Sequence, residues 1–336
     1  MKVICIKQNM MTTRRHFIRT VSGATLALAL PKVLIAGKSE AADRWGKLLP
    51  LRQLGSTGES VTMLGLGGFH IGRMDDPMAE KTVELAVQEG IRFFDTAESY
   101  QTGVAEEKYG KFLTPKYRDE IFLMTKTRAR NYRTAEEHLH GSLKRLKTDR
   151  LDLWLMHSIE NEDDVKSRLQ NGVLKFMIEA RSKGLVRHIG FSGHTTTGAH
   201  LSLLEQSDDV EVCMMPVNVV DTGYDSFVNK VLPELKKKKK GVIAMKTLAG
   251  GAFFGRGFDG AMDARDRVID HISVEEAIQY ALSVPNDVLV TGPKTPEMLQ
   301  EKIDIVNQFQ RLSDGEMESL FRKVEHLADG QVEYYK

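Results

Sequence analysis

Short apolar runs alternate with longer amphipathic stretches along the chain from Leu51 onward. The runs have the length of buried strands, whereas apolar positions in the stretches between them recur with helical spacing. The chain contains eight repeats of this pair. The alternation is typical of a parallel sheet, and eight repeats favour a closed barrel over a doubly wound sheet. The predicted fold class is therefore α/β, as a (β/α)8 TIM barrel.

The predicted strands lie at residues 61–67, 91–95, 121–126, 151–157, 186–192, 212–218, 242–247 and 287–292. The predicted helices lie at residues 78–89, 105–112, 134–146, 174–183, 198–204, 226–239, 274–282 and 296–309. Ahead of the first strand, residues 48–64 form two short runs around Ser-Thr-Gly. We expect a β-hairpin there that plugs the floor of the barrel.

The N-terminal segment has a different pattern, with charged residues followed by a short apolar run and then small residues. It resembles a twin-arginine export signal with Arg14 and Arg15 as the pair. The apolar run is broken by Pro31 and is shorter than the roughly 20 residues that span a membrane. We expect residues 1–42 to be a leader and residues 43–336 to be one barrel domain. The alternative is a chance arginine pair before a disordered leader.

That signal predicts export through the twin-arginine translocation machinery to the periplasm, and a retained leader would leave the protein anchored to the membrane. The balance of 47 basic and 46 acidic residues gives a net charge of +1. A chain with so small a net charge is not expected to bind nucleic acid, which attracts strongly basic proteins. No metal site is predicted.

Four polar residues lie at or just beyond the ends of three predicted strands: Asp95, Tyr100, Lys126 and His157. In parallel α/β folds, catalytic groups collect at the carboxyl ends of the strands. Each residue alone has a structural explanation, such as a helix cap, a solvated strand end or a satisfied core histidine. Four of them at matching strand ends favour an active site.

The chemistry of these side chains suggests a division of roles. Bringing the Tyr100 phenol from a pKa of about 10 to about 7 needs roughly 4 kcal/mol of preferential stabilisation of the phenolate. One ammonium at about 4 Å in an effective dielectric near 20 supplies roughly that much. Lys126 is the predicted ammonium, and Asp95 is expected to keep it charged against burial. His157 is left to orient a substrate oxygen or to share the proton.

From about Leu51 to about Leu327 the chain resembles the aldo-keto reductases. The resemblance rests on the motifs RQLGSTGESVTMLGLGG, FFDTAESY, LMTKT, LDLWLMHS, HIGFSGH and TGPKTPE. It implies a (β/α)8 barrel that binds NAD(P)H, and a catalytic tetrad of Asp95, Tyr100, Lys126 and His157 with the tyrosine as proton donor. The implied activity is NAD(P)H-dependent interconversion of an aldehyde or ketone and its alcohol by hydride transfer, with a sugar-like substrate as one option.

The resemblance also implies cofactor-binding positions, which are Gly67, Asp95, Ser192, Asn218, Lys246, Leu248, Gly292, Lys294, Thr295 and Lys302. The chain departs from many members in having Gly193 in place of an asparagine and Met245 in place of an aromatic residue. The arginine that grips the 2′-phosphate in many members is Met298 here, but Lys294 and Lys302 could supply the charge. NADP(H) is therefore favoured over NAD(H).

Export raises a difficulty, because free nicotinamide cofactor is not expected outside the cytoplasm. Turnover there would need a tightly held cofactor or a second redox partner, which the sequence does not identify. One alternative is an exported cofactor-binding sensor or interaction subunit with incidental redox activity. Another is a barrel hydrolase or lyase that uses Asp95 and His157. The glycine-rich loop at residues 250–266 is predicted to cover the cofactor or the substrate.

Overall fold

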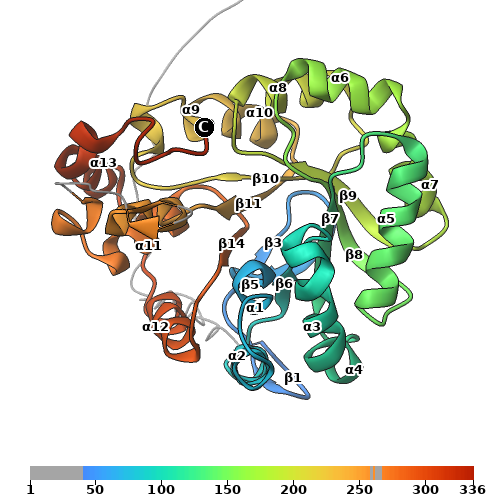
Figure 1. Cartoon of the computed structure of the whole chain (residues 1–336). Coiled ribbons are helices and arrows are strands. Elements are labelled where there is room, and N and C mark those ends of the chain that lie inside the picture. The colour runs from blue at the N-terminus through green and yellow to red at the C-terminus, as the bar shows by residue number, and fades with distance from the viewer. Residues whose placement is uncertain (1–40, 258–259, 262–266) are drawn as a thin grey trace, which may run out of the picture. The chain divides into compact units, whose positions relative to one another are not determined.

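The computed structural model describes residues 41–336 except 258–259 and 262–266, so residues 1–40 of the predicted leader lie outside it. Eight parallel strands close into a barrel, which confirms the predicted fold class (Figure 1). In chain order they are β5 (Leu64–Gly67), β6 (Phe93–Asp95), β7 (Phe122–Thr127), β8 (Leu151–Met156), β9 (Val186–Ser192), β10 (Val212–Pro216), β11 (Gly241–Met245) and β14 (Val288–Thr291).

The strands are buried on both of their faces. Every residue of β7 and β8 is buried, because one face points into the barrel and the other packs against helices. Trp154, for example, makes an edge contact with Phe176 in the helical layer, at 6.0 Å between ring centroids. Strands buried on both faces read as nearly continuous apolar runs. This explains why the strand positions could be predicted from the apolar runs in the sequence.

The predicted hairpin is present: β3 (Leu51–Gln53) pairs antiparallel with β4 (Ser60–Thr62). Leu54 and Val61 from this hairpin are fully buried in one cluster with side chains of the barrel strands, among them Met124 and Leu155. Arg52 ties the hairpin to the wall by donating to the carbonyl oxygens of Asn286 and Leu282 at 2.9 and 3.0 Å. The hairpin therefore plugs the barrel floor, as predicted.

Helices surround the strands (Figure 1). The main ones are α2 (Asp76–Gln88), α3 (Val104–Phe112), α5 (Tyr132–Arg145), α6 (Glu162–Gln170), α7 (Val173–Ser182), α8 (Thr197–Gln206), α9 (Phe227–Lys230), α10 (Leu232–Lys237), α11 (Val274–Ser283), α12 (Pro296–Asn307) and α13 (Asp314–Val324). Shorter elements are β1 (Ala42–Asp43), β2 (Gly46–Lys47), α1 (Gly68–Ile71), η1 (Tyr100–Gly103), α4 (Thr114–Tyr117), η2 (Asp221–Gly223), η3 (Ala249–Phe254), β12 (Arg256–Gly257), β13 (Gly260–Ala261), η4 (Val268–Asp270) and η5 (Glu325–Leu327).

The helix prediction needs three corrections. The helix expected at residues 226–239 is divided at Val231, because α10 restarts there with a proline in its first turn, where a missing N–H does no harm. Helices α6 and α13 were not predicted. The start of α13 carries a capping box between Ser313 and Glu316, a local signal that the apolar pattern alone does not reveal.

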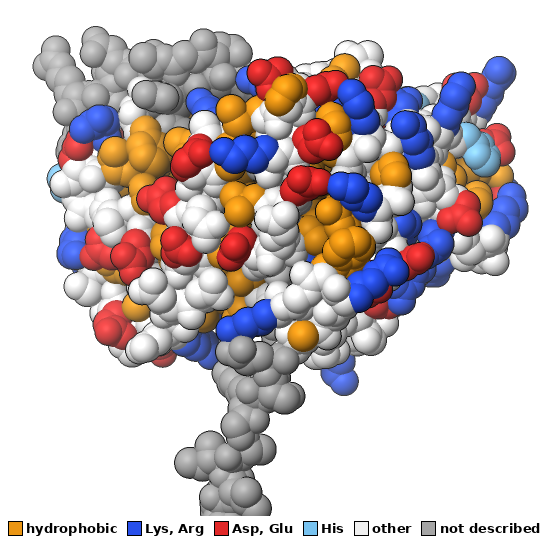
Figure 2. Space-filling view, turned by 90° about the horizontal axis from the view of Figure 1, so that it is seen from below, with side chains coloured by type: hydrophobic (Ala, Val, Ile, Leu, Met, Phe, Trp, Pro, Cys, Tyr) orange, Lys and Arg blue, Asp and Glu red, His pale blue; other side chains and the backbone are white. Residues whose placement is uncertain are grey.

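Acidic and basic side chains alternate over the face shown in Figure 2, with apolar side chains in small patches between them. This mixture agrees with the net charge of +1. None of the helices within the described residues is long and apolar enough to cross a membrane.

The close approach of β9 and β10 predicts a large effect of one small substitution. A Cβ added to Gly190 would collide with the carbonyl oxygen of Val212 and lie 2.9 Å from Leu155 Cδ2. Gly190→Ala should therefore lower the free energy of unfolding by about 1–3 kcal/mol, measured by urea denaturation. Gly315→Ala, where a helical Cβ meets nothing within 4 Å, is the matched control and should leave stability unchanged or slightly raised. Equal stability of the two variants would contradict this account.

Candidate active site

The four predicted catalytic residues meet at the carboxyl end of the barrel. Asp95 ends β6, Lys126 is the penultimate residue of β7, and His157 follows β8 directly. The backbone N–H of His157 donates to the carbonyl oxygen of Thr127 at 2.8 Å, which continues the β7–β8 pairing by one residue. Tyr100 lies at the start of η1, in the loop that follows Asp95. The strand register therefore sets the spacing of the site.

Lys126 lies at the centre of this group. Its ammonium pairs with the carboxylate of Asp95 and donates to the Thr96 carbonyl oxygen at 2.8 Å and to the Tyr100 hydroxyl oxygen at 3.2 Å. Lys126 and Asp95 are only 1% and 2% exposed. Three donors in one ammonium thus meet a carboxylate, a carbonyl and a phenol.

Tyr100 is fixed by aromatic neighbours and by an unusual turn. Its ring makes edge contacts with His157 at 5.8 Å and with Phe69 at 5.2 Å between centroids. The next two residues, Gln101 and Thr102, have φ angles of 48° and 54°, in the left-handed region that side chains other than glycine rarely adopt. Strain of this kind persists where the surrounding structure enforces it, and it clusters at functional sites. The turn holds the phenol at the mouth.

The pKa of Tyr100 corrects an expectation from the sequence. Burial raises the pKa of the phenol above its usual value of 10.0, and the Lys126 ammonium opposes this rise without overcoming it. Lys126 therefore does not bring the free phenol towards neutrality. At neutral pH Tyr100 keeps its proton, which is the state that a proton donor needs before it reacts.

Lys126 remains charged in the same surroundings. Burial acts to lower its pKa, but the Asp95 carboxylate and the Tyr100 phenol outweigh burial, so that the net pKa is raised. The ammonium is then available at all working pH values to stabilise a phenolate 3.2 Å away.

His157 is held neutral. Burial, with the nearby Lys126 and Arg128 charges, takes its pKa well below 6.5. Ser99 Oγ lies 3.3 Å from Nδ1 and orients the ring. A neutral imidazole beside Tyr100 can donate a hydrogen bond to a substrate oxygen, but it does not carry a positive charge.

A residue that sequence reasoning missed supports the main chain at His157. Arg168 of α6 is fully buried and donates to the carbonyl oxygens of His157 and Ser158 at 2.9 and 3.0 Å. Its Nε donates to Asp164 at 2.9 Å, which balances the buried charge. Ser158 has a φ of 49°, so this support lies where the backbone turns sharply. A buried arginine inside a polar helix leaves no signal in the apolar pattern.

Cationic side chains gather at the mouth around His70, which follows β5. Burial lowers the pKa of His70 to about 4, and Lys294, Arg73 and Lys246 add to this effect because their charges are close. No residue in the described part of the chain makes a hydrogen bond with the buried Nδ1 of His70. Among the residues that the structure describes, no carboxylate pairs with Lys246, whose pKa is lowered by burial. An ammonium without a carboxylate and an unsatisfied imidazole suit a phosphate group.

The loop between β14 and α12 adds to this anion-binding character. A Cβ on Gly292 would lie 2.5 Å from His70 Nδ1, so only glycine allows the loop to approach the ring. Thr295 caps α12 by accepting from the backbone N–H of Met298 at 3.3 Å. A helix N-terminus of this kind favours phosphate. The residues present therefore fit the phosphates of a nicotinamide cofactor.

The other predicted cofactor residues are placed as follows. Gly67 and Ser192 end β5 and β9 at the mouth, and Leu248 lies two residues after Lys246. Lys302 donates along its own helix to the carbonyl oxygen of Met298 at 3.1 Å. A phosphate contact from Lys302 would require that side chain to turn. These assignments stay predictions.

Asn218 is already engaged within the protein. Its amide donates to Glu333 Oε1 at 2.8 Å and to the Tyr335 hydroxyl at 3.0 Å. A cofactor contact by this amide would therefore require residues 333–335 to move. The predicted cover at residues 250–266 lies partly outside the described residues.

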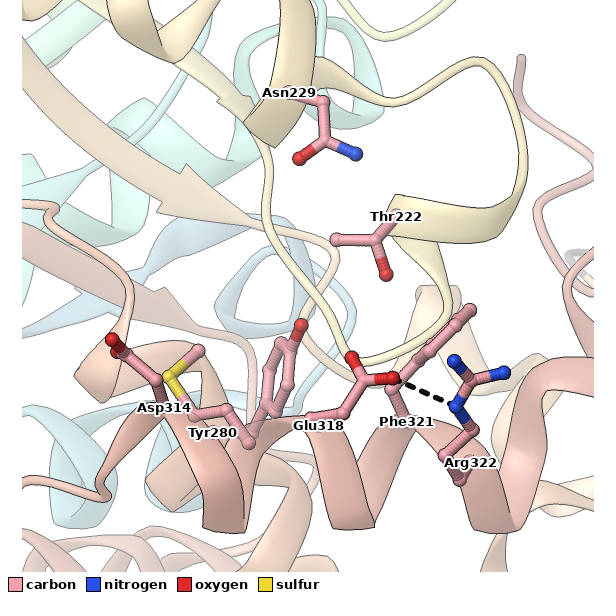
Figure 3. Close-up of a pocket in the computed structure, with 8 residues that line it drawn as sticks. Thr222, Asn229, Tyr280, Asp314, Glu318, Phe321 and Arg322 are labelled. Carbon is pink, nitrogen blue, oxygen red and sulfur yellow. Dashed lines mark hydrogen bonds and ion pairs between the residues drawn. The ribbon is translucent and has the colours of Figure 1, made fainter.

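A surface pocket of about 440 Å³ lies between α11 and α13, outside this mouth (Figure 3). Tyr280, Met317 and Phe321 form its apolar lining, and Thr222 and Asn229 border it from η2 and α9. Arg322 pairs with Glu318 at 2.7 Å and with Glu325 at 2.8 Å, so the charges at its rim satisfy one another within the same helical segment. The acid–base groups and the ammonium without a carboxylate are at the barrel mouth, which is the candidate active site.

Comparison with known proteins identifies relatives of the whole barrel. A model of the aldo/keto reductase family matches residues 63–268. The L-galactose dehydrogenase of Arabidopsis thaliana is 30% identical over 62% of this chain and 68% of that protein. Among solved structures, the holo form of an aldo-keto reductase from Bacillus halodurans is 22% identical with a TM-score of 0.69, covering 82% of this chain and 96% of that one. An aldo-keto reductase from Klebsiella pneumoniae in complex with NADPH is 20% identical with a TM-score of 0.66, covering 82% and 95%.

The histidine environments predict a pattern in NMR titration of the cofactor-free protein. Burial takes the pKa of His70 and of His194 to about 4, so both rings should stay neutral from pH 8 to pH 5. His188 is the internal control: burial lowers its pKa, but Glu211 and Glu59 outweigh burial, and the ring should titrate above pH 6.5. Below about pH 6.5 these two histidines bind protons in the unfolded chain but stay neutral in the folded protein. They therefore lower the free energy of unfolding as pH falls. A His70 resonance that moves between pH 7 and pH 5 would contradict the assignment.

Proposed function

The chain belongs to the aldo/keto reductase family, since the matched residues 63–268 are more than half of its 336 residues, and from this we propose how it acts. It is an NAD(P)-dependent oxidoreductase that interconverts a carbonyl compound and its alcohol. In our proposal Tyr100 is the proton donor. The observation that carries this is the Lys126 ammonium, buried between the Asp95 carboxylate and the Tyr100 phenol.

The substrate carbonyl oxygen accepts hydrogen bonds from Tyr100 and His157, whose rings lie together at the mouth. A nicotinamide cofactor, when bound, would supply the hydride that reduces the carbonyl carbon. As the oxygen gains negative charge, the phenol releases its proton to it, and the alcohol is complete. Lys126 stabilises the phenolate that remains, and Asp95 keeps Lys126 charged. In the oxidative direction the phenolate takes the proton back.

His157 positions the oxygen without competing for its proton. Its low pKa makes it a neutral hydrogen-bond donor throughout the working pH range. The contact with Ser99 at 3.3 Å fixes the ring, and Arg168 fixes the backbone beneath it. A donor held in place in this way stabilises developing oxyanion charge without reorganisation.

We assign the phosphates of the cofactor to Lys246, Lys294 and His70, which lie together at the mouth. NADP(H) is proposed over NAD(H), because the extra phosphate of NADP(H) suits the excess of cations. The NADPH complex of the Klebsiella pneumoniae relative supports this choice. For the substrate we propose a small polar, sugar-like carbonyl compound, in line with the similarity to L-galactose dehydrogenase.

Tyr100→Phe tests the proton donor. It should lower the turnover of aldehydes by about 10²- to 10⁴-fold and leave the dissociation constant for NADPH, from fluorescence titration, within a factor of about two. Tyr132→Phe is the matched control, because it removes a hydroxyl that pairs with Glu179 on the helical layer, and it should retain turnover.

The outcomes separate the competing functions. Retained turnover in Tyr100→Phe would remove the tyrosine from the mechanism. Binding of NADPH without turnover by the wild type would favour a cofactor-dependent sensor. Activity that survives removal of all nicotinamide would favour a hydrolase or lyase. Comparison of NADPH with NADH in the same titration tests the cofactor preference.

We also propose that residues 1–42 direct export to the periplasm, as a leader ahead of one barrel domain at residues 43–336. The support is the sequence pattern around Arg14 and Arg15, which lies outside the described residues. Because that machinery carries folded proteins, the cofactor could be loaded before export, and reoxidation would then need a redox partner of unknown identity.

The export proposal predicts that residues 1–42 carry a fused reporter to the periplasm of a bacterium with the twin-arginine pathway. The double substitution Arg14→Lys with Arg15→Lys should lower export by at least about tenfold, measured by cell fractionation. Arg19→Lys, a nearby change of the same chemistry, should leave export unchanged. Export of the doubly substituted fusion at the normal level would remove the proposal.

A further inference from the structure

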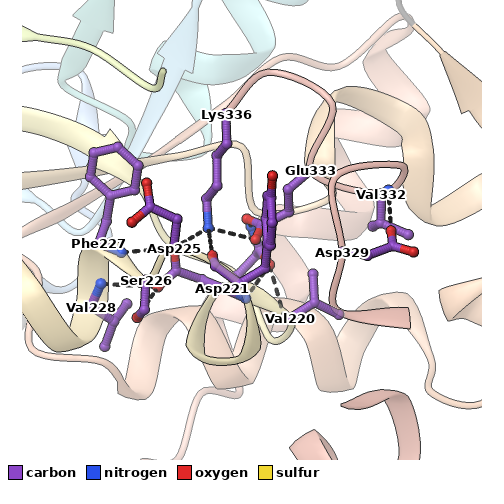
Figure 4. Close-up of polar contacts among 12 residues, drawn as sticks. Val220, Asp221, Asp225, Ser226, Phe227, Val228, Asp329, Val332, Glu333 and Lys336 are labelled. Carbon is purple, nitrogen blue, oxygen red and sulfur yellow. Dashed lines mark hydrogen bonds and ion pairs between the residues drawn. The ribbon is translucent and has the colours of Figure 1, made fainter. Parts of the chain in front are cut away.

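The final residues of the sequence pack back onto the loop after β10. Residues 329–336, which we term the tail, reach Asp221 (Figure 4). Lys336 of the tail also reaches the backbone of Tyr224. The Lys336 ammonium donates to Asp221 Oδ1 at 2.8 Å, to the Tyr224 carbonyl oxygen at 2.6 Å and to Glu333 Oε2 at 2.5 Å. The side chains of Lys336, Asp221 and Glu333 are at most 1% exposed. This is a buried cluster of charges rather than a loose surface contact.

The receiving side of this cluster is rigid. The Asp221 carboxylate accepts from Ser226 Oγ at 2.7 Å and from the backbone N–H groups of Phe227 and Val228 at 3.1 and 2.9 Å. These bonds fix the carboxylate independently of the tail. Lys336 therefore binds to an acceptor that is already in position, which favours one defined tail conformation.

Asn218 is the second anchor. Its Oδ1 accepts from the backbone N–H groups of Val220 and Asp221 at 2.9 and 3.0 Å, which fixes the amide in its turn. Its Nδ2 then donates to Glu333 and to the Tyr335 hydroxyl, and that hydroxyl donates to Glu333 at 2.8 Å. Asn218, Glu333 and Tyr335 form a closed triangle of buried hydrogen bonds.

The consequence of this anchoring appears at the mouth. The Tyr335 ring lies 5.1 Å from the ammonium of Lys246, and the Tyr334 ring lies 6.0 Å from it. His194 Nδ1 lies 3.1 Å from the Tyr335 carbonyl oxygen. A Cβ on Gly250 would lie 2.6 Å from the Tyr334 hydroxyl, so the glycine loop fits closely against the tail. Two tail tyrosines thus border an ammonium at the mouth that has no carboxylate partner within the described chain.

We propose that Tyr334 and Tyr335 form an aromatic wall of the cofactor site, which holds the Lys246 ammonium where it meets a phosphate, and that the Asp221–Lys336–Glu333 cluster and Asn218 position this wall. The inference rests on the proposed function. A lysine side chain has a flexible four-carbon stem, and a wall that restricts it reduces the ordering needed on binding. Aromatic faces also attract an ammonium without neutralising it.

A double-mutant cycle on NADPH affinity tests the wall. Tyr335→Leu removes the ring and should weaken NADPH binding by about tenfold, measured by fluorescence titration. Lys246→Met should weaken it at least as much. Because the wall acts through Lys246, adding Tyr335→Leu to Lys246→Met should cause little further loss, within about twofold. Inorganic pyrophosphate, as a competitor of NADPH, should show the same non-additivity.

Variants of the anchor provide a second measurement. Lys336→Met should weaken NADPH binding and lower the melting temperature, because it leaves the Asp221 and Glu333 carboxylates buried without their cation. Lys323→Met is the matched control, since that lysine makes an exposed pair with Glu276 at 3.2 Å, and it should change neither quantity. Tyr335→Phe keeps the ring and should bind NADPH more tightly than Tyr335→Leu does.

Three results would overturn the inference. Tighter NADPH binding by Tyr335→Leu would mean that the tail obstructs the site. Equal losses on adding Tyr335→Leu to the wild type and to the Lys246→Met variant would mean that the tyrosine does not act through Lys246. Unchanged NADPH affinity in both Tyr335→Leu and Lys336→Met would mean that the tail has no part in cofactor binding. A wild-type chain that binds neither NADPH nor NADH would instead overturn the proposed function itself, and this inference with it.

Discussion

The ion pair between Lys126 and Asp95 is the interaction on which the rest of the site depends. Burying two charges is costly, and the cost is recovered only when the geometry is good and the remaining hydrogen-bonding groups are satisfied. The barrel meets this requirement, because β6 and β7 are neighbouring parallel strands whose ends hold both groups on rigid backbone. Removing either partner would leave a buried charge alone. The phenol of Tyr100 then lies beside an ammonium that stays charged, although burial still raises the pKa of the phenol.

The two buried lysines at the mouth differ in whether a carboxylate balances their charge. Lys126 has its carboxylate, whereas Lys246 has none among the described residues. Burial and these cations together keep His70, His157 and His194 neutral. A neutral imidazole and an ammonium without a carboxylate leave room for the charge of a ligand, and in our proposal the phosphates of the cofactor supply it. The charge of Lys126 is therefore balanced within the protein, whereas that of Lys246 is not balanced by any described carboxylate.

Strands and hairpin could be predicted because their burial on defined faces leaves regular apolar runs in the sequence, as in β7 and β8. Strand-end position then predicted which side chains meet. Three features could not be predicted in this way. Helix α6 is polar, and its buried Arg168 matters through backbone contacts. The pKa of Tyr100 depends on whether burial or Lys126 dominates, and only the geometry decides that. The Asn218–Glu333 bond joins residues 115 positions apart, and no local pattern encodes such a pair.

Aromatic rings beside Lys246 suit the phosphate-binding role that we propose for that lysine. A carboxylate in their place would raise its pKa and hold it still, as Asp95 does for Lys126, but it would also cancel the attraction for a phosphate. A purely aliphatic wall would leave the ammonium desolvated without any favourable partner. Tyrosine faces attract the cation and keep its net charge, and the Tyr335 hydroxyl remains free to bond Asn218 and Glu333 at the other end of the ring. In our proposal the Tyr335 ring contacts Lys246 at the mouth, while its hydroxyl bonds to Asn218 and Glu333. The buried cluster at Asp221 and Lys336 thereby fixes the position of the Lys246 ammonium.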